Sequence, residues 1–225
     1  MSIDGIIVAV DGPAGSGKSS VAREVALRSG LKYVDSGALY RAVTLHIIRT
    51  RGKVVDDLDF SSIIDEISLK QRYNDDATCT TFLNGVDVSE DIRTEKIAAN
   101  IGIVSDQKVV RDFVNNYIRS WAADNSIIID GRDIGTVVFP DATLKVYLDA
   151  SVDERTRRRA LEYTEKGKDV DVNSIKSQII LRDTQDENRP FGALKKAKDA
   201  HYLDTSNHSR DEVVTMLCEM INEIY

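Results

Sequence analysis

The sequence predicts an α/β fold in which a parallel sheet carries helices on both of its faces. Short runs rich in β-branched residues alternate with longer amphipathic stretches, an order typical of repeated strand–helix–strand units. The three prolines all fall at the junctions between these segments, where proline is tolerated. A chain of 225 residues is long enough for one such domain with a small insert.

The expected elements follow the chain in this alternating order. We expect strands at residues 6–10, 32–34, 127–129, 144–148 and 201–203, and helices at residues 18–29, 38–51, 107–123, 152–166, 174–185 and 209–224. Residues 54–94 break the alternation with short acidic segments. Within them, residues 78–83 and 86–88 flank Asn84-Gly85, a dipeptide that favours a tight β-hairpin turn. We interpret this region as an insert.

The composition excludes several classes of protein. A net charge of −7 argues against a broad basic surface for the backbone of a nucleic acid polymer. Cys79 and Cys218 lie far apart without a Cys-x-x-Cys pair, which predicts neither a disulfide framework nor a zinc cluster and fits a reduced compartment. No apolar stretch approaches the roughly 18 residues of a membrane span, and the first residues do not resemble a signal peptide. We therefore expect a cytoplasmic protein without a membrane partner.

A phosphate-binding loop is the most specific motif in the sequence. Residues 12–19 match the pattern G-x-x-x-x-G-K-[ST] between an expected strand and an expected helix, as the motif requires. Glycines let the backbone fold around a polyphosphate, Lys18 would contact its β- and γ-phosphates, and the Ser19 hydroxyl would bind Mg²⁺. The candidate ATP-binding residues are Gly12, Pro13, Ala14, Gly15, Ser16, Gly17, Lys18, Ser19 and Ser20.

This loop predicts the binding of ATP or GTP but does not identify a reaction. Motors, switches and small-molecule kinases share it, and a glycine-rich turn that contains Lys-Ser by chance is the alternative without function. The sequence has no Asn-Lys-x-Asp motif, which argues against a GTPase switch.

Two further segments carry arginines directly after expected strands. Asp35-Ser-Gly-Ala-Leu-Tyr-Arg41 follows the second strand, and Asp130-Gly-Arg-Asp133 follows the third. Open α/β sheets bind ligands at the carboxyl ends of their strands, so Arg41 and Arg132 can converge on one phosphate with bidentate geometry. A solvated helix arginine and a turn with a local ion pair are the alternatives, and the two placements together favour a second anion site.

The sequence resembles the bacterial cytidylate kinases of the nucleoside monophosphate kinase superfamily. Matching segments occur in order over almost the whole chain. They are residues 12–20, 34–41, 83–89, 92–94, 130–142 and 148–151, Glu154-Arg155, Arg158-Arg159, Arg182-Asp183, Asp186, Asn188-Arg189, Asp199-Ala200 and residues 203–205.

The resemblance implies the residues that bind CMP, which are Ser36, Tyr40, Arg41, Arg111, Arg132, Asp133, Arg182, Asp186 and Arg189. Arg41, Arg132 and Arg189 would hold the acceptor phosphate, and Ser36 and Tyr40 would line the same pocket. Arg182 and Asp186 would meet the ribose hydroxyls. Arg111 and Asp133 would read cytosine, because an aspartate accepts a hydrogen bond from the C4 amine whereas uracil presents an oxygen there.

The implied activity is ATP-dependent phosphorylation of CMP and dCMP to CDP and dCDP by a monomer that uses Mg²⁺. The acceptor phosphate is already close to a dianion at neutral pH, so transfer needs alignment and charge neutralisation and no general base. The implied catalytic residues are Lys18, Arg132, Arg158 and Arg159. Arg155, Arg158 and Arg159 match the family pattern of a helical lid over ATP, whereas Arg157 is additional to that pattern; a solvated basic helix face is the alternative.

The resemblance also implies how the chain is divided. A single P-loop kinase domain of residues 1–225 would have a core of residues 1–53, 95–150 and 190–225. An insert of about residues 54–94 would form a small antiparallel subdomain that binds the nucleoside monophosphate, and residues of about 151–189 would form the lid.

Two departures from the family pattern affect the expected site. Gly102 stands where other members carry a serine that assists base recognition; Ser105 replaces it or no residue does, which loosens the expected discrimination against UMP. Residues 189–194 replace a run that more often contains Ser-Pro-Leu. The rival hypotheses are a P-loop kinase for another nucleoside monophosphate or a shikimate-like acid, and a non-enzymatic nucleotide sensor.

Overall fold

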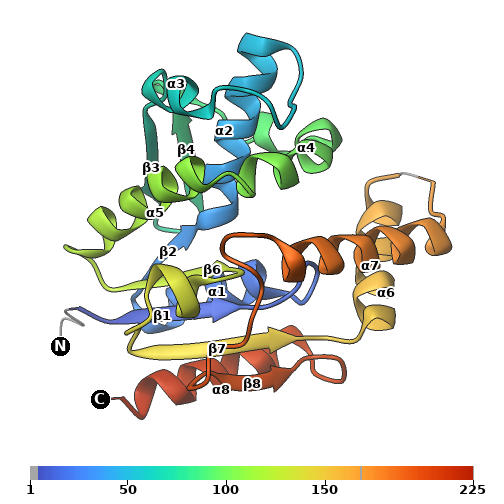
Figure 1. Cartoon of the computed structure of the whole chain (residues 1–225). Helices are drawn as coiled ribbons and strands as arrows, with labels where there is room; N and C mark the ends of the chain where they lie inside the picture. The colour runs from blue at the N-terminus through green and yellow to red at the C-terminus, as the bar shows by residue number, and fades with distance from the viewer. Residues whose placement is uncertain (1–4, 168, 225) are drawn as a thin grey trace.

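The main sheet has five parallel strands, as the sequence predicts. The computed structural model describes residues 5–167 and 169–224 (Figure 1). The strands lie in the order β2-β6-β1-β7-β8 and are β1 (Ile7–Asp11), β2 (Lys32–Asp35), β6 (Ile127–Gly131), β7 (Leu144–Asp149) and β8 (His201–Asp204). Each expected strand is present and extends one or two residues further toward its carboxyl end.

Side-chain alternation along the strands builds an apolar core on each face of the sheet. Val8 and Val10 contribute to one buried cluster and Ala9 to the other, because successive side chains of a strand point to opposite faces. Ile128 likewise lies in a different cluster from Ile127 and Ile129. Helices therefore cover both faces, and the predicted α/β class is confirmed.

Four helices cover these two faces. Helices α1 (Lys18–Ser29) and α8 (Arg210–Asn222) pack together against the face that includes Val8 and Val10. Helices α2 (Ser36–Arg51) and α5 (Lys108–Ala122) cover the opposite face. Asp35 starts α2 because its carboxylate accepts a hydrogen bond from the Ala38 backbone N–H at 2.9 Å.

A small antiparallel sheet stands apart from the main sheet, above it in Figure 1. Its strands β3 (Leu69–Tyr73), β4 (Cys79–Leu83) and β5 (Val86–Asp87) lie in sequence order. The predicted hairpin turn is present: Asn84 and Gly85 have φ values of 50° and 80°, and Leu83 pairs with Val86. The positions of four elements here were not predicted, namely β3, α3 (Phe60–Asp65), the short helix η1 (Asp91–Arg93) and α4 (Glu95–Ser105).

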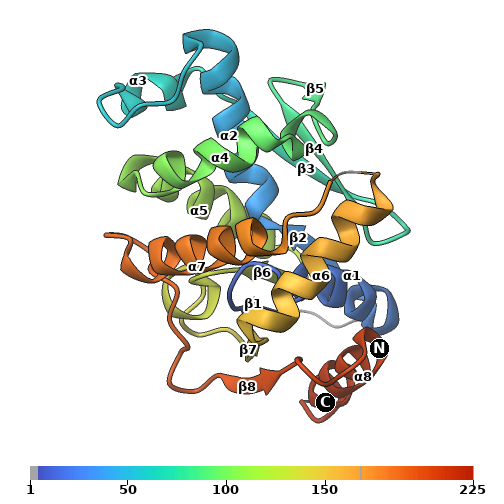
Figure 2. The ribbon, with the colours of Figure 1, turned by 90° about the vertical axis from the view of Figure 1, so that its right-hand side faces the viewer.

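Two long helices pack side by side at the carboxyl edge of the main sheet (Figure 2). They are α6 (Val152–Glu165) and α7 (Val172–Asn188), which begin at the capping residues Ser151 and Asp171. A single π-helical turn, η2 (Ile134–Val138), follows β6 near the same edge. Helices, turns and strand ends thus surround one region, where ligands of open α/β sheets bind.

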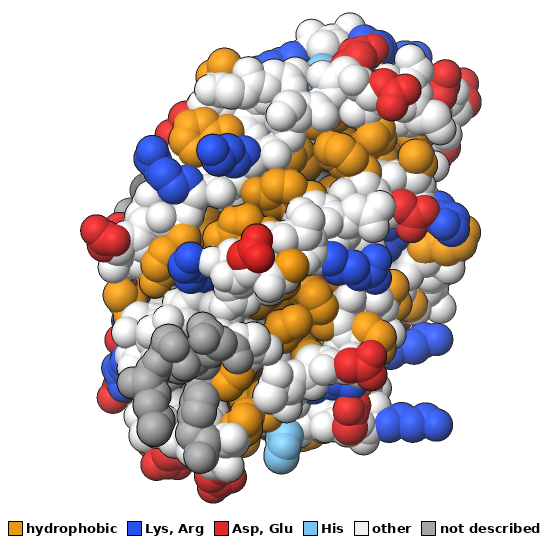
Figure 3. Space-filling model, turned by 90° about the vertical axis from the view of Figure 1, so that its left-hand side faces the viewer, with side chains coloured by type: hydrophobic (Ala, Val, Ile, Leu, Met, Phe, Trp, Pro, Cys, Tyr) orange, Lys and Arg blue, Asp and Glu red, His pale blue; other side chains and the backbone are white. Residues whose placement is uncertain are grey.

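Among the described residues, no helix combines the length and the apolar character that a membrane span requires. The face in Figure 3 carries basic and acidic side chains interspersed with apolar ones rather than one broad basic area.

Candidate active site

The phosphate-binding loop connects β1 to α1 at the carboxyl edge of the sheet. Gly12 has a φ of 150°, and a Cβ atom there would overlap the backbone carbonyl oxygen of Leu148 on the neighbouring strand. Gly17, with a φ of 92°, directly precedes the first residue of α1. The loop therefore needs glycine at these positions, and it leads into a helix N-terminus, where backbone N–H groups favour anions.

Lys18 lies buried inside this loop. Its Nζ donates to the carbonyl oxygen of Pro13 at 2.5 Å and to the Ser16 hydroxyl at 3.2 Å. Burial lowers the pKa of the Lys18 ammonium below its ordinary value, and the nearby Arg132 guanidinium lowers it further. An anion in the loop would oppose both effects and favour the charged form.

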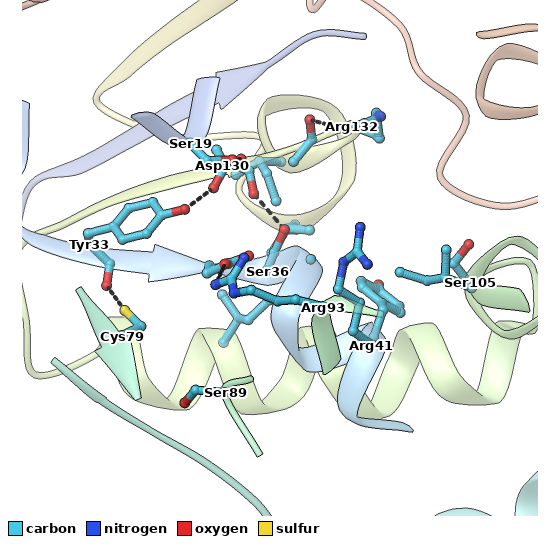
Figure 4. A pocket seen from close by; sticks show the side chains of 18 of the residues that line it. Ser19, Tyr33, Ser36, Arg41, Cys79, Ser89, Arg93, Ser105, Asp130 and Arg132 are labelled. Atoms are coloured by element: carbon cyan, nitrogen blue, oxygen red, sulfur yellow. Dashed lines mark hydrogen bonds and ion pairs between the residues drawn. The ribbon is translucent and has the colours of Figure 1, made fainter. Parts of the chain in front are cut away.

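Asp130 accepts hydrogen bonds from the hydroxyl groups of three elements (Figure 4). Its carboxylate accepts hydrogen bonds from Ser19 Oγ of α1 and from the Tyr33 hydroxyl of β2, each at 2.7 Å. Its backbone carbonyl accepts one from Ser36 Oγ at 2.5 Å. Burial raises the pKa of Asp130, and the charge of Asp35 raises it further. A cation beside this carboxylate would favour its charged form and so lower the raised pKa.

Asp11 at the end of β1 fixes the chain that follows β6. Its two carboxylate oxygens accept the backbone N–H groups of Ile134 and Gly135, both at 2.8 Å. Burial raises the pKa of Asp11 to about 6, although the two hydrogen bonds act in the opposite direction. This contact holds Arg132 and Asp133 in place directly before the turn.

A cavity of about 830 Å³ opens between the main sheet and the small antiparallel sheet. Eight of the nine expected CMP-binding residues line it, which are Ser36, Tyr40, Arg41, Arg111, Arg132, Asp133, Arg182 and Arg189. The ninth, Asp186, has a fully buried side chain next to three of these arginines. Residues from α2, α5, α7 and the segment after β6 therefore meet in one place.

Asp186 is the common partner of three guanidinium groups. Its Oδ2 lies 2.6 Å from Arg132 Nε, and its Oδ1 lies 3.5 Å from Arg182 Nε and also pairs with Arg189. Arg189 Nε lies 3.0 Å from Asp106 Oδ1 as well. Asp186 and Asp106 thus position the three arginines, and two carboxylates cannot neutralise three guanidinium groups.

Arg41 enters the cavity from α2 with little compensation for its charge. Its closest described bond is a long one to the carbonyl oxygen of Ile92, at 3.4 Å. Burial lowers the pKa of the Arg41 guanidinium, the charge of Asp35 acts in the opposite direction, and Arg182 and Arg93 lower it again. Buried positive charge in excess of its partners is the electrostatic signature of an anion site.

Arg111 and Asp133 form a buried ion pair on another wall of the cavity. Arg111 Nη1 donates to the carbonyl oxygen of Ser105 at 3.1 Å, and the guanidinium lies 5.5 Å from the ring centroid of Tyr40. Burial raises the pKa of Asp133, while the Arg111 charge lowers it. The pair presents a carboxylate and a planar guanidinium, the two groups that can recognise the hydrogen-bonding edge of a base.

The Gly102 position carries no group that reaches this pair. Gly102 lies on α4, and a Cβ atom there would meet nothing within 4 Å. The Ser105 hydroxyl, one of the two alternatives considered for the missing serine, donates to the Gly102 carbonyl at 3.1 Å. Ser105 does line the cavity, and its carbonyl oxygen orients Arg111.

The arginines of α6 differ in their surroundings. Arg155 is buried and forms a two-bond ion pair with Asp183 of α7, at 2.9 and 2.7 Å, and donates to the Ala14 carbonyl of the phosphate-binding loop at 3.2 Å. Arg158 donates to the carbonyl oxygens of Thr205 at 2.7 Å and Ser16 at 3.4 Å. Arg159 lines neither cavity and pairs with Glu162 at 2.8 Å.

A smaller cavity of about 250 Å³ lies beside the phosphate-binding loop. Gly17 and Ser20 form one side of it, and Arg157 and Arg158 of α6 form another. Another wall comes from Thr205, His208 and Ser209, between β8 and α8, and from the first turn of α8. The start of α1 therefore borders both hollows, because Ser19 lines the larger one, which contains the arginine cluster, and Ser20 lines the smaller one.

Several residues that shape the site were given no role from the sequence, although Asp183 belongs to a segment that matches the family pattern. Asp11 holds the segment after β6, and Asp183 pairs with Arg155 between α7 and α6. Tyr33 and Asp106 contact Asp130 and Arg189. An acid that directly ends an apolar strand, as Asp11 does, is the one sequence signal that points to such a role.

The fold and the two hollows are those of an α/β P-loop protein that has a second, arginine-lined cavity. Comparison with known proteins narrows this class. A model of the cytidylate kinase family matches residues 8–223, and the chain belongs to that family, as its sequence motifs predict.

Curated relatives match over nearly the whole chain. Cytidylate kinases from Lactobacillus johnsonii, Shouchella clausii and Fusobacterium nucleatum are 42%, 38% and 37% identical, over 96%, 97% and 99% of this chain and 94%, 97% and 100% of theirs. A crystal structure of an uncharacterized protein from Eubacterium ventriosum shares the fold, with a TM-score of 0.53 and 17% identity over 96% of this chain and 98% of that one.

Proposed function

We propose that this chain transfers the γ-phosphoryl group of ATP to CMP or dCMP by means of the two facing hollows described above. The activity, phosphorylation of CMP and dCMP in pyrimidine nucleotide metabolism, follows from membership of the cytidylate kinase family. The observation that carries the proposal for this chain's own residues is the partly uncompensated arginine cluster opposite the phosphate-binding loop.

The donor nucleotide would occupy the loop and the smaller cavity. The backbone N–H groups of residues 12–20 would surround its phosphates, with the Lys18 ammonium beside the group that is transferred. The smaller cavity is continuous with Gly17 and Ser20, so it is the place for the nucleoside part. Arg158, which already contacts the Ser16 carbonyl, would turn toward the phosphates when the lid closes.

The acceptor would bind in the larger cavity with its phosphate toward the loop. Arg41, Arg132 and Arg189 supply guanidinium groups for that phosphate, and Arg182 and Asp186 lie beside them for the ribose. Arg111 and Asp133 form the far wall, where the base would lie. Catalysis then consists of aligning two phosphates and neutralising their charge, because the acceptor oxygen needs no general base.

Ser19 and Asp130 are suited to the Mg²⁺ that accompanies ATP. Ser19 Oγ lies 2.7 Å from Asp130 Oδ2, and both are oxygen donors of the kind that Mg²⁺ prefers. When bound, the ion would neutralise charge on the phosphates. Ser19 and Asp130 would hold it, directly or through water.

The proposal assigns a role to each part of the chain. Residues of about 54–94 bind the acceptor as an insert, about 151–189 close as a lid over the donor, and residues 1–53, 95–150 and 190–225 form the core. We place the protein in the cytoplasm as a monomer that binds ATP and CMP or dCMP.

A panel of acceptors tests the proposal. Release of ADP is measured with CMP, dCMP, UMP, AMP and shikimate, and the highest kcat/KM is expected with CMP or dCMP. Lys18→Met keeps the buried volume but removes the ammonium, so kcat is expected to fall by about 10²–10³-fold while the circular dichroism spectrum is unchanged. A better rate with another acceptor would favour a different small-molecule kinase, and the absence of ADP release with every acceptor would favour a nucleotide sensor.

A further inference from the structure

The segment between α7 and β8 lies directly against the Arg111–Asp133 pair. Gly192, within this segment, has a φ of 63°. A Cβ atom on Gly192 would overlap the guanidinium of Arg111, at Nη2 and Cζ, and the Oδ2 atom of Asp133. The backbone of Gly192 is therefore in contact with both members of the pair.

Arg111 and Asp133 have little space into which they can withdraw. Their side chains are 5% and 6% exposed. Arg111 is further held by the Ser105 carbonyl at 3.1 Å and by the Tyr40 ring. A side chain at residue 192 would therefore force Arg111 to give up part of this arrangement.

The segment itself is fixed on both sides of Gly192. Before it, Arg189 pairs with Asp186 and lies 3.0 Å from Asp106. After it, the Leu194 backbone N–H donates to the Asp186 carbonyl oxygen at 2.8 Å, and the Leu194 side chain is buried. The backbone at residue 192 is thus anchored within three residues in each direction, so the contact with Arg111 and Asp133 is built into the fold.

We infer that Gly192 is a specificity-determining positioning residue for the acceptor base. Its backbone forms one side of the Arg111–Asp133 pair and holds the Asp133 carboxylate in the orientation that selects a base with an exocyclic amine. This inference rests on the proposed function and adds to it a residue that does not itself need to touch the base.

Displacement of Arg111 would change the acceptor preference in a defined direction. A guanidinium that is pushed aside no longer fixes the Asp133 carboxylate, so the hydrogen bond to the C4 amine of cytosine loses its geometry. Binding of uracil depends less on the orientation of this carboxylate, so displacement of Arg111 weakens it less. The ratio of kcat/KM for CMP to that for UMP should therefore fall about tenfold, while the KM for ATP stays within about twofold.

Gly30 provides a matched control for the backbone strain. Its φ of 68° is close to that of Gly192, and a Cβ atom there would meet nothing within 4 Å. Gly192→Ala and Gly30→Ala therefore impose a similar conformational cost, but only the first introduces an overlap with the base-reading pair. Gly192→Asn is a second variant, since asparagine tolerates positive φ while it also carries a Cβ atom.

The experiment compares acceptor kinetics of the wild-type enzyme, these three variants, Asp133→Asn and Gly192→Ala/Asp133→Asn. The inference is supported if the CMP-to-UMP ratio falls in both Gly192 variants, holds in Gly30→Ala, and falls no further when Gly192→Ala is added to Asp133→Asn. It is overturned if the folded Gly192 variants keep the wild-type ratio, or if the effects of the double variant add. A wild-type enzyme that does not prefer CMP would instead refute the proposed function. The wild-type kinetics therefore test the proposed function separately from the role of Gly192.

Discussion

Asp133 illustrates how one buried carboxylate can determine the choice of acceptor. Burial raises its pKa and the Arg111 guanidinium lowers it. Each charge of the pair thus offsets the cost of burying the other. Within the proposed site, this carboxylate can only accept a hydrogen bond, which suits the amine of cytosine and opposes the C4 oxygen of uracil.

The change Asp133→Asn should therefore weaken the preference for cytosine. The amide keeps the size of the side chain but can also donate, so uracil is no longer excluded. Because one well-formed base contact contributes about 1–3 kcal/mol of discrimination, the ratio of kcat/KM for CMP to that for UMP should fall by roughly 10- to 100-fold. Steady-state kinetics with both acceptors measures this ratio. An unchanged ratio would remove Asp133 from base recognition.

Lys18 should make the binding of ATP depend on pH. Burial lowers the pKa of its ammonium in the free protein, whereas phosphates around it would raise that pKa again. Between these two pKa values the lysine is neutral in the free protein and charged in the complex. Binding should then take up protons, and both this uptake and the loss of affinity should grow as the pH rises from 6.5 toward 9.

Calorimetric titration of MgATP in two buffers with different ionisation enthalpies measures that uptake. Lys18→Met is the control, because it lacks the titrating group and should show no rise in uptake with pH. Equal uptake at every pH in the wild-type protein would contradict a lowered pKa at Lys18.

The strands show which elements could be predicted from sequence. All five main strands were predicted from their apolar runs, but each ends later than expected because residues outside these runs, such as Asp11, Asp35 and Gly131, continue the pairing. The helix α4 was missed although Ile97, Ile101 and Val104 share one buried face, since Gly102 interrupts a pattern that otherwise indicates a helix.

Site residues could be predicted only where they belong to a short sequence motif. The phosphate-binding loop and the arginines follow short patterns that can be recognised in a linear sequence. Asp11, Asp183 and Gly192 act through residues that lie far away in the sequence, for example Asp11 through Ile134 and Asp183 through Arg155. Such contacts depend on tertiary packing, so neither propensity nor local periodicity predicts them.

The helix pair α6 and α7 is joined to the phosphate-binding loop through Arg155. This buried guanidinium pairs with Asp183 and also donates to the Ala14 carbonyl oxygen. Asp183→Asn should remove the charge that compensates Arg155 and loosen both helices relative to the loop. The KM for ATP should rise about five- to tenfold, with the KM for CMP within about twofold of the wild-type value.

The pair Lys176–Asp153 offers a matched control for this prediction. It joins the same two helices at 2.7 Å, but its side chains are 45% and 81% exposed. Exposed ion pairs contribute little because water screens them, so Lys176→Met should leave both KM values unchanged. Equal effects of the two substitutions would show that contact between the helices, rather than the link to the loop, controls the donor site.

At the scale of the whole molecule, the insert and the core share one apolar interior. Helix α2 begins next to the main sheet and extends to the small antiparallel sheet (Figure 1). One continuous cluster of buried residues includes Ala9 and Ile129 of the main sheet as well as Phe60, Leu83 and Val88 of the insert. Because these residues are desolvated together, the two parts should unfold as one cooperative unit.

Differential scanning calorimetry should therefore show a single transition that CMP moves as a whole. A ligand at about 100 times its Kd stabilises the folded state by about 2.7 kcal/mol, which corresponds to a Tm increase of roughly 5–10 °C for a chain of this size. Arg41→Ala should reduce the shift caused by CMP while leaving the shape of the transition intact, because Arg41 contributes charge to the cavity rather than apolar surface to the cluster. Two resolved transitions, with CMP moving only one of them, would mean that the insert folds independently and that the shared cluster does not couple it to the sheet.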